Sequence, residues 1–377
     1  MRLYTTRAKL VYACLFFVLA SMHAEAEVTS AKVVMTDSVA SGLAPTKRIA
    51  ITNVMVSFQA SVGGDKTNTS GLFAAKTDAS TSVQMPEMDT KLLGEITDEI
   101  YAQLKADLTA SGFEVLPEAT VVASPAYQKI IKEAGISNFS KFADKSGDVM
   151  LVGASSLKPY LAYNAETGAF GYPSKHLIKG WVSISGASST PGGPTGTSIG
   201  TIYKLPGLEV ELAKELNANV LKATYVVTLG STKASVDRFS SSHQNTYTGT
   251  AFVQVGLRAD QTRIAFRTPA AKSKGESTSH SISSNFGDKS PPAKDGDVVV
   301  TLAESLAGGT DFFAVQEPSN PTGSGIAKFL LGSGNFGKGA DVQFNYIASI
   351  SDPAAYHADV VAMVKVAQRD MLNLVKP

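Results

Sequence analysis

The chain has 377 residues, and its 34 Lys and Arg residues almost balance its 33 Asp and Glu residues, which leaves a formal net charge of +1. A surface so close to neutral gives no electrostatic case for nucleic-acid binding. The single cysteine, Cys14, excludes a fold stapled by intramolecular disulfides. The stability of the chain must therefore come from a hydrophobic core, which this length can support.

The N-terminal segment has the pattern of a cleavable export signal. Basic residues at the start precede an apolar run from Leu10 to Ala20, and the A-x-A motif Ala24-Glu25-Ala26 follows. We therefore expect residues 1–26 to be a signal peptide and Glu27 to begin the mature chain. The apolar run is too short for a membrane anchor. Cys14 lies inside that run rather than at its end, which argues against lipidation.

Beyond the expected signal, we predict an α/β (α+β) fold in which a mixed sheet is flanked by amphipathic helices. A polar N-terminal extension at residues 27–46, with one possible edge strand at Lys32–Met35, leads into a single domain at residues 47–377. The stretch at residues 158–207 is rich in Gly, Ser, Thr and Pro. The stretch at residues 270–297 is nearly free of apolar residues. We interpret them as loop insertions.

The stretch from Lys47 to Leu116 predicts the core of the domain. It opens with KRIAITNVMVSF, a β-branched apolar run that is typical of a buried strand. A polar passage from Ser57 to Pro86, interpreted as a long loop, separates this strand from an amphipathic helix. The N-cap of the helix is Asp89 or Thr90, and Gly112 marks its end. A second short strand follows that glycine, and the order strand, helix, strand indicates a βαβ-like unit.

The remaining elements follow from shorter patterns. We predict helices at residues 126–134, after a Ser124-Pro125 start and before Gly135, at 208–216 and 353–375, and one further helical turn at 139–143. We predict strands at residues 148–157, 176–185, 222–230, 250–257, 264–267, 298–302 (or a helix start there) and 342–350. The turn Ala259-Asp260-Gln261 lies between two of these strands, so 250–257 and 264–267 are expected to form a hairpin. The Gly-rich residues 308–339 are expected to be loose.

Three of these segments resemble one known family in their type and order. They are the strand KRIAITNVMVSF, the turn Ala110-Ser111-Gly112-Phe113-Glu114-Val115 and the strand Asp148-Val149-Met150-Leu151-Val152-Gly153. This order is similar to that of the curli secretion channel family, whose fold is shared with the outer-membrane lipoproteins that activate penicillin-binding proteins. The resemblance implies a periplasmic α/β domain without enzymatic activity, which works by assembly or by binding another envelope protein.

The resemblance also implies that the elements at residues 209–230 and 250–267 complete the sheet. The chain departs from the family in the position of its cysteine and in its Gly/Ser-rich insertions. The resemblance therefore does not extend to lipid anchoring or to pore formation.

Two glycine motifs match catalytic or cofactor patterns, but their contexts favour loops. Gly196-Thr197-Ser198-Ile199-Gly200 matches the G-x-S-x-G nucleophile pattern, yet prolines on both sides oppose the strand and helix that a nucleophile elbow needs. Gly332-Ser333-Gly334-Asn335-Phe336-Gly337 matches the dinucleotide pattern G-x-G-x-x-G, yet a strand rather than a helix is predicted after it. We expect both motifs to be Gly-rich loops.

Metal sites have little support in the residue spacing. The histidines of the mature chain have no ligand spacing and are expected at the surface; they are His176, His243, His280 and His357. Asp295-Gly296-Asp297 lacks the further oxygen ligands of a calcium loop and is interpreted as a turn. A group of aromatic residues fits either a carbohydrate or protein contact surface or a satellite core beneath the loops; it consists of Tyr160, Tyr163, Phe170, Tyr172 and Trp181.

From these patterns we predict no catalytic, cofactor-binding or metal-binding residue. We expect an exported, periplasmic, non-catalytic cell-envelope protein that binds or assembles with another envelope or secretion component. Its partner would be an envelope protein or a further copy of the chain. Two alternatives stay open: a periplasmic serine hydrolase that uses Ser198, and a subunit of a surface fibre or layer, which the Gly, Ser and Thr content favours. Contact with the outer membrane is expected to be at most peripheral, because residues 176–185 and 238–247 lack a continuous outward apolar row.

Overall fold

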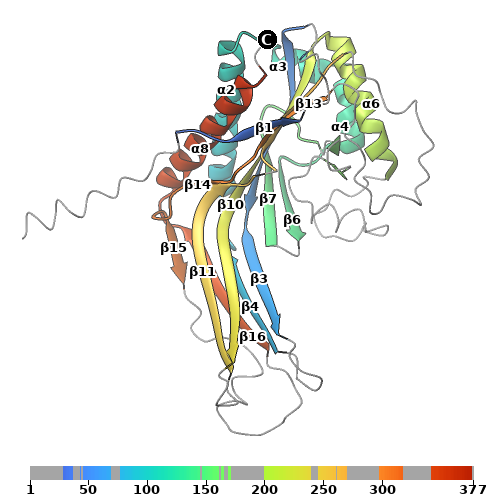
Figure 1. Cartoon of the computed structure of the whole chain (residues 1–377). Helices are drawn as coiled ribbons and strands as arrows, with labels where there is room; N and C mark the ends of the chain where they lie inside the picture. Colours follow the sequence, from blue (N-terminus) through green and yellow to red (C-terminus); the bar gives the residue numbers. More distant parts are fainter. Residues whose placement is uncertain are drawn as a thin grey trace, which may run out of the picture.

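The computed structural model describes residues 29–36, 43, 46–68, 77–144, 147–160, 163–164, 169–170, 199–238, 245–259, 261–269, 297–316 and 341–375. Within these residues the fold is mixed α/β, with two mixed sheets and helices on both faces of the larger one (Figure 1). This confirms the predicted fold class. Among the described residues, no helix is long and apolar enough to cross a membrane.

The larger sheet has ten strands and is built around β2 (Arg48–Gln59), which is buried on both faces. The strand order is β1-β13-β12-β10-β2-β7-β6, with β5 beside β2, and with β11 beside β10 and β14. The other strands are β1 (Val33–Thr36), β5 (Glu114–Val115), β6 (Phe139–Asp144), β7 (Gly147–Gly153), β10 (Asn219–Arg238), β11 (Asn245–Leu257), β12 (Arg263–Arg267), β13 (Asp297–Leu302) and β14 (Leu306–Ala307). β2 runs parallel to β10 and β5 but antiparallel to β7, so the sheet is mixed.

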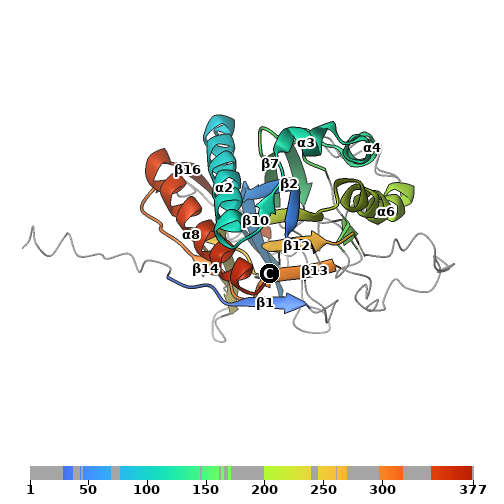
Figure 2. The ribbon, with the colours of Figure 1, turned by 90° about the horizontal axis from the view of Figure 1, so that it is seen from above.

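Helices cover the two faces of this sheet in two separate layers (Figure 2). On one face lie α2 (Thr90–Ala110) and α8 (Pro353–Asn373), whose apolar stripes form the largest hydrophobic cluster together with alternate residues of the central strands. On the other face lie α3 (Glu118–Ala123), α4 (Pro125–Ala134) and α6 (Ile199–Leu216), which share a second cluster with the sheet. Because both faces are covered, the central strands are apolar without strict alternation.

The predicted β2–α2–β5 unit is confirmed in detail. The Asp89 side chain accepts hydrogen bonds from the Lys91 and Leu92 amides at the start of α2, as an N-cap does. After the helix, Gly112 has a φ of +89°, the left-handed conformation that glycine adopts without steric cost. β5 then pairs parallel to the start of β2. The start of α4 is also as predicted, because Ser124 accepts from the amide of Tyr127.

The smaller sheet has the strand order β15-β16-β4-β3 and packs against the far ends of β10 and β11. Its strands are β3 (Ser61–Asn68), β4 (Thr77–Gln84), β15 (Phe313–Gln316) and β16 (Asp341–Ile350). We call this sheet, together with residues 228–238 of β10 and 245–256 of β11, the blade. In Figure 1 the blade projects away from the helix-covered body.

The two layers of the blade meet over a small apolar cluster made of Val83, Met85, Leu229, Val253 and Ala348. A glycine makes this close contact possible. A Cβ atom on Gly249 of β11 would lie 2.4 Å from the Phe344 ring of β16. The neighbouring Tyr346 hydroxyl donates to the Gly249 carbonyl oxygen at 2.8 Å, which ties the layers together.

Three segments predicted as loops or turns contain strands instead. The predicted loop from Ser57 to Pro86 is wrong, because β3 and β4 form an antiparallel hairpin within it. These strands are Ser-, Thr- and Gly-rich, so their sequence lacks the apolar alternation that identifies a strand. The predicted helical turn at 139–143 is also wrong, because β6 pairs antiparallel with β7. Likewise β15 lies inside the stretch 308–339 that was expected to be loose.

The predicted hairpin of 250–257 with 264–267 is wrong as well. β11 pairs with residues 227–238 of β10, and β12 pairs with residues 220–224 of the same strand. The two strands therefore follow one another along one edge of β10 and do not pair with each other. α6 begins at Ile199, well before the predicted start at Leu208. The strand predicted at 148–157 ends at Gly153, and 298–302 is a strand, part of β13.

The N-terminal extension contributes an edge strand, as predicted. β1 pairs antiparallel with β13 at one rim of the larger sheet. The Ala31 amide donates to the Asp370 carboxylate near the end of α8 at 2.7 Å, and the Arg369 guanidinium donates to the Thr29 carbonyl oxygen at 2.8 Å. These contacts join the beginning of the described chain to its C-terminal helix.

Candidate functional site

Several residues singled out in the sequence lie outside the described residues. They are Ser198, the motif Gly332–Gly337, His176, His243, His280, Tyr172, Trp181, Asp295, Gly296 and the strand predicted at 176–185. α6 begins at Ile199, directly after Ser198. Asp297 is the first residue of β13. Within the described part of the chain, no group of three or more His, Cys, Asp and Glu side chains is placed to hold a metal ion.

His357 takes part in a contact between the two helices of one layer. Its Nε2 atom lies 2.8 Å from Glu99 Oε2, which joins α8 to α2. The histidine is therefore a side chain of the helix interface. Among the described residues, His357 has no further metal-ligating side chains grouped around it.

The predicted aromatic group is partly core. Tyr160 is fully buried in the cluster beneath α4 and α6, which fits the satellite-core interpretation and excludes this residue from a contact surface. Tyr163 and Phe170 are register partners in a short two-stranded sheet, β8 (Tyr163–Asn164) and β9 (Ala169–Phe170).

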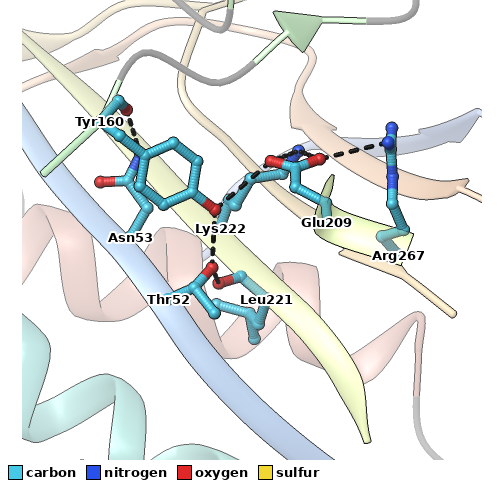
Figure 3. A network of polar contacts seen from close by, with 7 residues as sticks. All are labelled: Thr52, Asn53, Tyr160, Glu209, Leu221, Lys222 and Arg267. Atoms are coloured by element: carbon cyan, nitrogen blue, oxygen red, sulfur yellow. Dashed lines mark hydrogen bonds and ion pairs between the residues drawn. The ribbon is translucent and has the colours of Figure 1, made fainter. Parts of the chain in front are cut away.

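Tyr160 belongs to a buried polar network that starts at an irregularity in β2 (Figure 3). Ile51 is the register partner of Leu221, and Asn53 is the partner of Lys222, so Thr52 is the extra residue of a β-bulge. The Thr52 hydroxyl donates to the Leu221 carbonyl oxygen at 3.2 Å, next to the register shift.

The bulge turns two consecutive side chains toward the same partner. Thr52 Oγ1 lies 2.9 Å from the Tyr160 hydroxyl, and the Asn53 side-chain amide donates to the Tyr160 carbonyl oxygen at 2.6 Å (Figure 3). In a regular strand these neighbours would point to opposite faces. The irregularity in β2 therefore fixes the chain that leads from β7 past Tyr160.

At the centre of the network is Glu209 of α6, whose side chain is fully buried. Lys222 Nζ donates to both carboxylate oxygens, at 2.9 and 2.8 Å, and Arg267 Nη1 lies 3.3 Å from Oε2. The Tyr160 hydroxyl donates to Oε1 at 3.3 Å. Lys222 and Arg267 are 8% and 6% exposed, so two cations and one carboxylate share a site that water barely reaches.

The electrostatics of this network keep the phenol of Tyr160 neutral. Complete burial and the nearby Glu209 carboxylate raise the pKa of Tyr160 well above its usual value. Burial alone raises the pKa of the neighbouring Tyr127 to about 12. Both carboxylate oxygens of Glu209 already accept hydrogen bonds, so the arrangement is typical of an ion cluster that holds a helix on a sheet.

Sequence reasoning missed this cluster, although each member interrupts an apolar pattern. Lys222 opens the otherwise apolar strand KATYVVTLG, and Arg267 closes the strand RIAFR. Their common partner, Glu209, comes from a different element. A contact between side chains of a helix and of two strands depends on how those elements pack, and the periodicity within each element gives no signal for it.

The second candidate site is the rim of the blade. We call the outer backbone edge of β11 between Asn245 and Gln254, on the side away from β10, the β11 edge. β14 pairs with β11 only at Gly256 and Leu257, beyond this stretch. Phe252 lies along it and is 57% exposed, the most exposed large apolar side chain of the described residues.

Comparison of the chain with protein-family models, curated proteins and solved structures found no match.

Proposed function

We propose that the protein is an exported, non-catalytic component of the cell envelope that binds another envelope or secretion component, or a further copy of itself, through the blade. The observation that carries this proposal is the blade. It extends two β layers away from the helix-covered body, and its rim offers a strand edge that no other described strand pairs with, beside an exposed Phe252. Backbone edges and exposed aromatic side chains are common means of protein recognition.

The rest of the structure supports the proposal as a rigid base for the blade. Both faces of the larger sheet are covered by helices, and β10 runs without interruption from the body into the blade. The buried cluster around Glu209 fastens α6 to β10 and β12. A binding element on a rigid base loses less conformational entropy when it engages a partner.

Site-specific photocrosslinking in intact cells tests this proposal. The photoreactive residue p-benzoyl-phenylalanine replaces Phe252 on the blade and, as a matched control, Ala106 on the exposed face of α2. We expect a discrete crosslinked species with the blade position and none with the helix position. Equal labelling at both positions, or no adduct at Phe252, would count against binding through the blade. Fractionation of the same cells checks export, and release of the protein by carbonate is expected for peripheral membrane contact.

The serine hydrolase is a second candidate that one observation favours. A nucleophile elbow places its serine directly before a helix, and α6 begins at Ile199, immediately after Ser198. A fluorophosphonate probe decides between the two functions, with Ser198→Ala as the control. We expect no labelling of the wild-type protein. Stoichiometric labelling that Ser198→Ala abolishes would establish the hydrolase instead. Filaments of the purified protein in electron micrographs would support the third possibility, a surface fibre.

A further inference from the structure

We infer that the β11 edge is where a second copy of the chain binds, with the two β11 strands pairing antiparallel. This inference rests on the proposed function and specifies its partner. It is carried by the state of that edge, by its lack of charge and by the geometry of self-pairing.

Within the described part of the chain, the β11 edge has no strand partner along most of its length. β10 pairs with the inner side of β11 from Leu257 to Asn245. On the outer side, β14 pairs at Gly256 and Leu257, and Val255 exchanges backbone hydrogen bonds with Gly308 and Gly309. Among the residues that the structure describes, no other strand pairs with this side of β11. Every second residue of the edge therefore offers its backbone N–H and C=O groups to water or to a further strand.

The sequence of β11 lacks the usual protection of an edge. The strand reads NTYTGTAFVQVGL and contains no charged residue and no proline over its 13 residues. Soluble proteins normally guard edge strands with charges, prolines or very short length. Three other rim strands follow that rule: β3 contains Asp65 and Lys66, β6 contains Lys141, and β15 has only four residues. An unguarded edge of this length is expected where a strand is meant to pair.

A second copy fits this edge better than a charged partner does. Two neutral strands that pair antiparallel bring no like charges together. In an antiparallel pair, the side chains of directly opposite residues point to the same face. Phe252 lies on the face of β11 that its even-numbered residues share. The corresponding faces of two blades therefore join into one surface only if Phe252 lies opposite an even-numbered residue of the second copy. A two-fold axis at Thr250 satisfies this condition, because it places Phe252 opposite Thr248 of the second copy. That register pairs residues 246–254 of both strands, which is nearly the whole open edge.

Self-pairing would also cover the exposed aromatic side chain. Phe252 and Thr250 are both exposed on the strand face that points away from the smaller sheet. In the two-fold register both Phe252 rings lie beside the new strand pair, where burial of apolar surface stabilises the contact. The interface is isologous, so it closes with two copies and forms a dimer rather than a fibre.

Single-cysteine variants test this register directly. The only cysteine of the chain is Cys14, which lies within residues 1–26, so the remainder contains no other thiol. Thr250→Cys places two thiols opposite one another at the two-fold axis, where Cα atoms of paired residues are about 5 Å apart, a distance that suits a disulfide. Ser231→Cys is the matched control, because Ser231 is exposed on the neighbouring β10 strand and is the register partner of Phe252 inside the β10–β11 ladder, one strand away from the β11 edge. We expect disulfide-linked dimers from Thr250→Cys under mild oxidation and monomers from Ser231→Cys.

Sedimentation measurements on the full exported chain test the affinity. We expect a concentration-dependent dimer for the wild type. Thr250→Lys should weaken the affinity of dimerisation about tenfold or more, because like charges then meet at the two-fold axis. Ser231→Lys should leave this affinity unchanged. Circular dichroism confirms folding, and if Thr250→Lys does not fold, the cysteine pair decides. A monomeric wild type, or equal crosslinking of both cysteine variants, would overturn the inference. A heterologous photocrosslink at Phe252 from a monomeric protein would leave the proposed function intact while refuting self-pairing.

Discussion

Replacing Glu209 with Gln removes one buried negative charge and keeps the shape of the side chain. The change leaves Lys222 and Arg267 close together, 8% and 6% exposed, without their shared counter-ion. Removing one partner of a buried ion pair typically costs about 3–5 kcal/mol, because the remaining charge stays desolvated. Since small domains have a total stability of about 5–15 kcal/mol, Glu209→Gln should lower the free energy of unfolding by a large fraction.

The same helix provides the control. Glu211, two residues further along α6, forms an ion pair with Lys129, and these side chains are 47% and 55% exposed. A pair this exposed contributes less than about 1 kcal/mol, so Glu211→Gln should be nearly neutral. Urea unfolding followed by circular dichroism measures both variants, and unchanged m-values show that the unfolded states are comparable. If Glu209→Gln were as stable as Glu211→Gln within about 1 kcal/mol, the network would not fasten α6 to the sheet.

Three further perturbations probe the core, the blade and the buried phenol. Leu104 is fully buried in the main core, so Leu104→Asp forces a charge into it and should lower the free energy of unfolding by several kcal/mol. Ala106→Asp, on the exposed side of α2, should leave thermal unfolding nearly unchanged. Gly249→Ala should speed hydrogen exchange in the blade, because the added Cβ would lie 2.4 Å from an aromatic ring, while Gly63→Ala, with 3.7 Å of space, should not. The pKa of Tyr160 is raised in the folded protein, so as the pH rises the phenol loses its proton in the unfolded chain before it does so in the folded one. Stability to urea should therefore fall as the pH rises above about 10, and it should fall less steeply in the Tyr160→Phe variant.

Local patterns predicted the body of the protein because its elements depend on neighbours in the sequence. The apolar stripe of α2, the Asp89 cap and the left-handed Gly112 all act within a few residues, and the structure contains each of them. In the blade, β16 was predicted, whereas the hairpin of β3 and β4 was missed for the opposite reason. β3 and β4 are polar strands whose pairing is specified by partners elsewhere in the chain, so neither their composition nor their periodicity identifies them.

The buried ion cluster and the β11 edge also depend on distant partners. From the sequence, Glu209 is an ordinary carboxylate of a helix, and only the packing of α6 on the sheet shows its buried partners. From the sequence, β11 is expected to pair with β12, and only the extension of β10 to Arg238 shows that β11 pairs with β10. In both cases the residues are visible in the sequence, but the element that packs or pairs with them is not. Tertiary contact, not local propensity, decides these positions.

Gly230 explains how one strand can serve both the body and the blade. The sequence pattern ends a strand at this glycine, yet β10 continues through it to Arg238. The register of β10 with β11 shifts between Thr228 and Gly230, and Gly230 has a φ of +130°, with only 2.1 Å between an added Cβ and the Phe252 carbonyl oxygen. The extra residue of this bulge lies on β11, where Gln254 and Val255 oppose Leu229 alone, and such a bulge bends the strand pair while disrupting the ladder only locally. The glycine that looks like a terminator is therefore the point where β10 leaves the covered sheet and enters the blade.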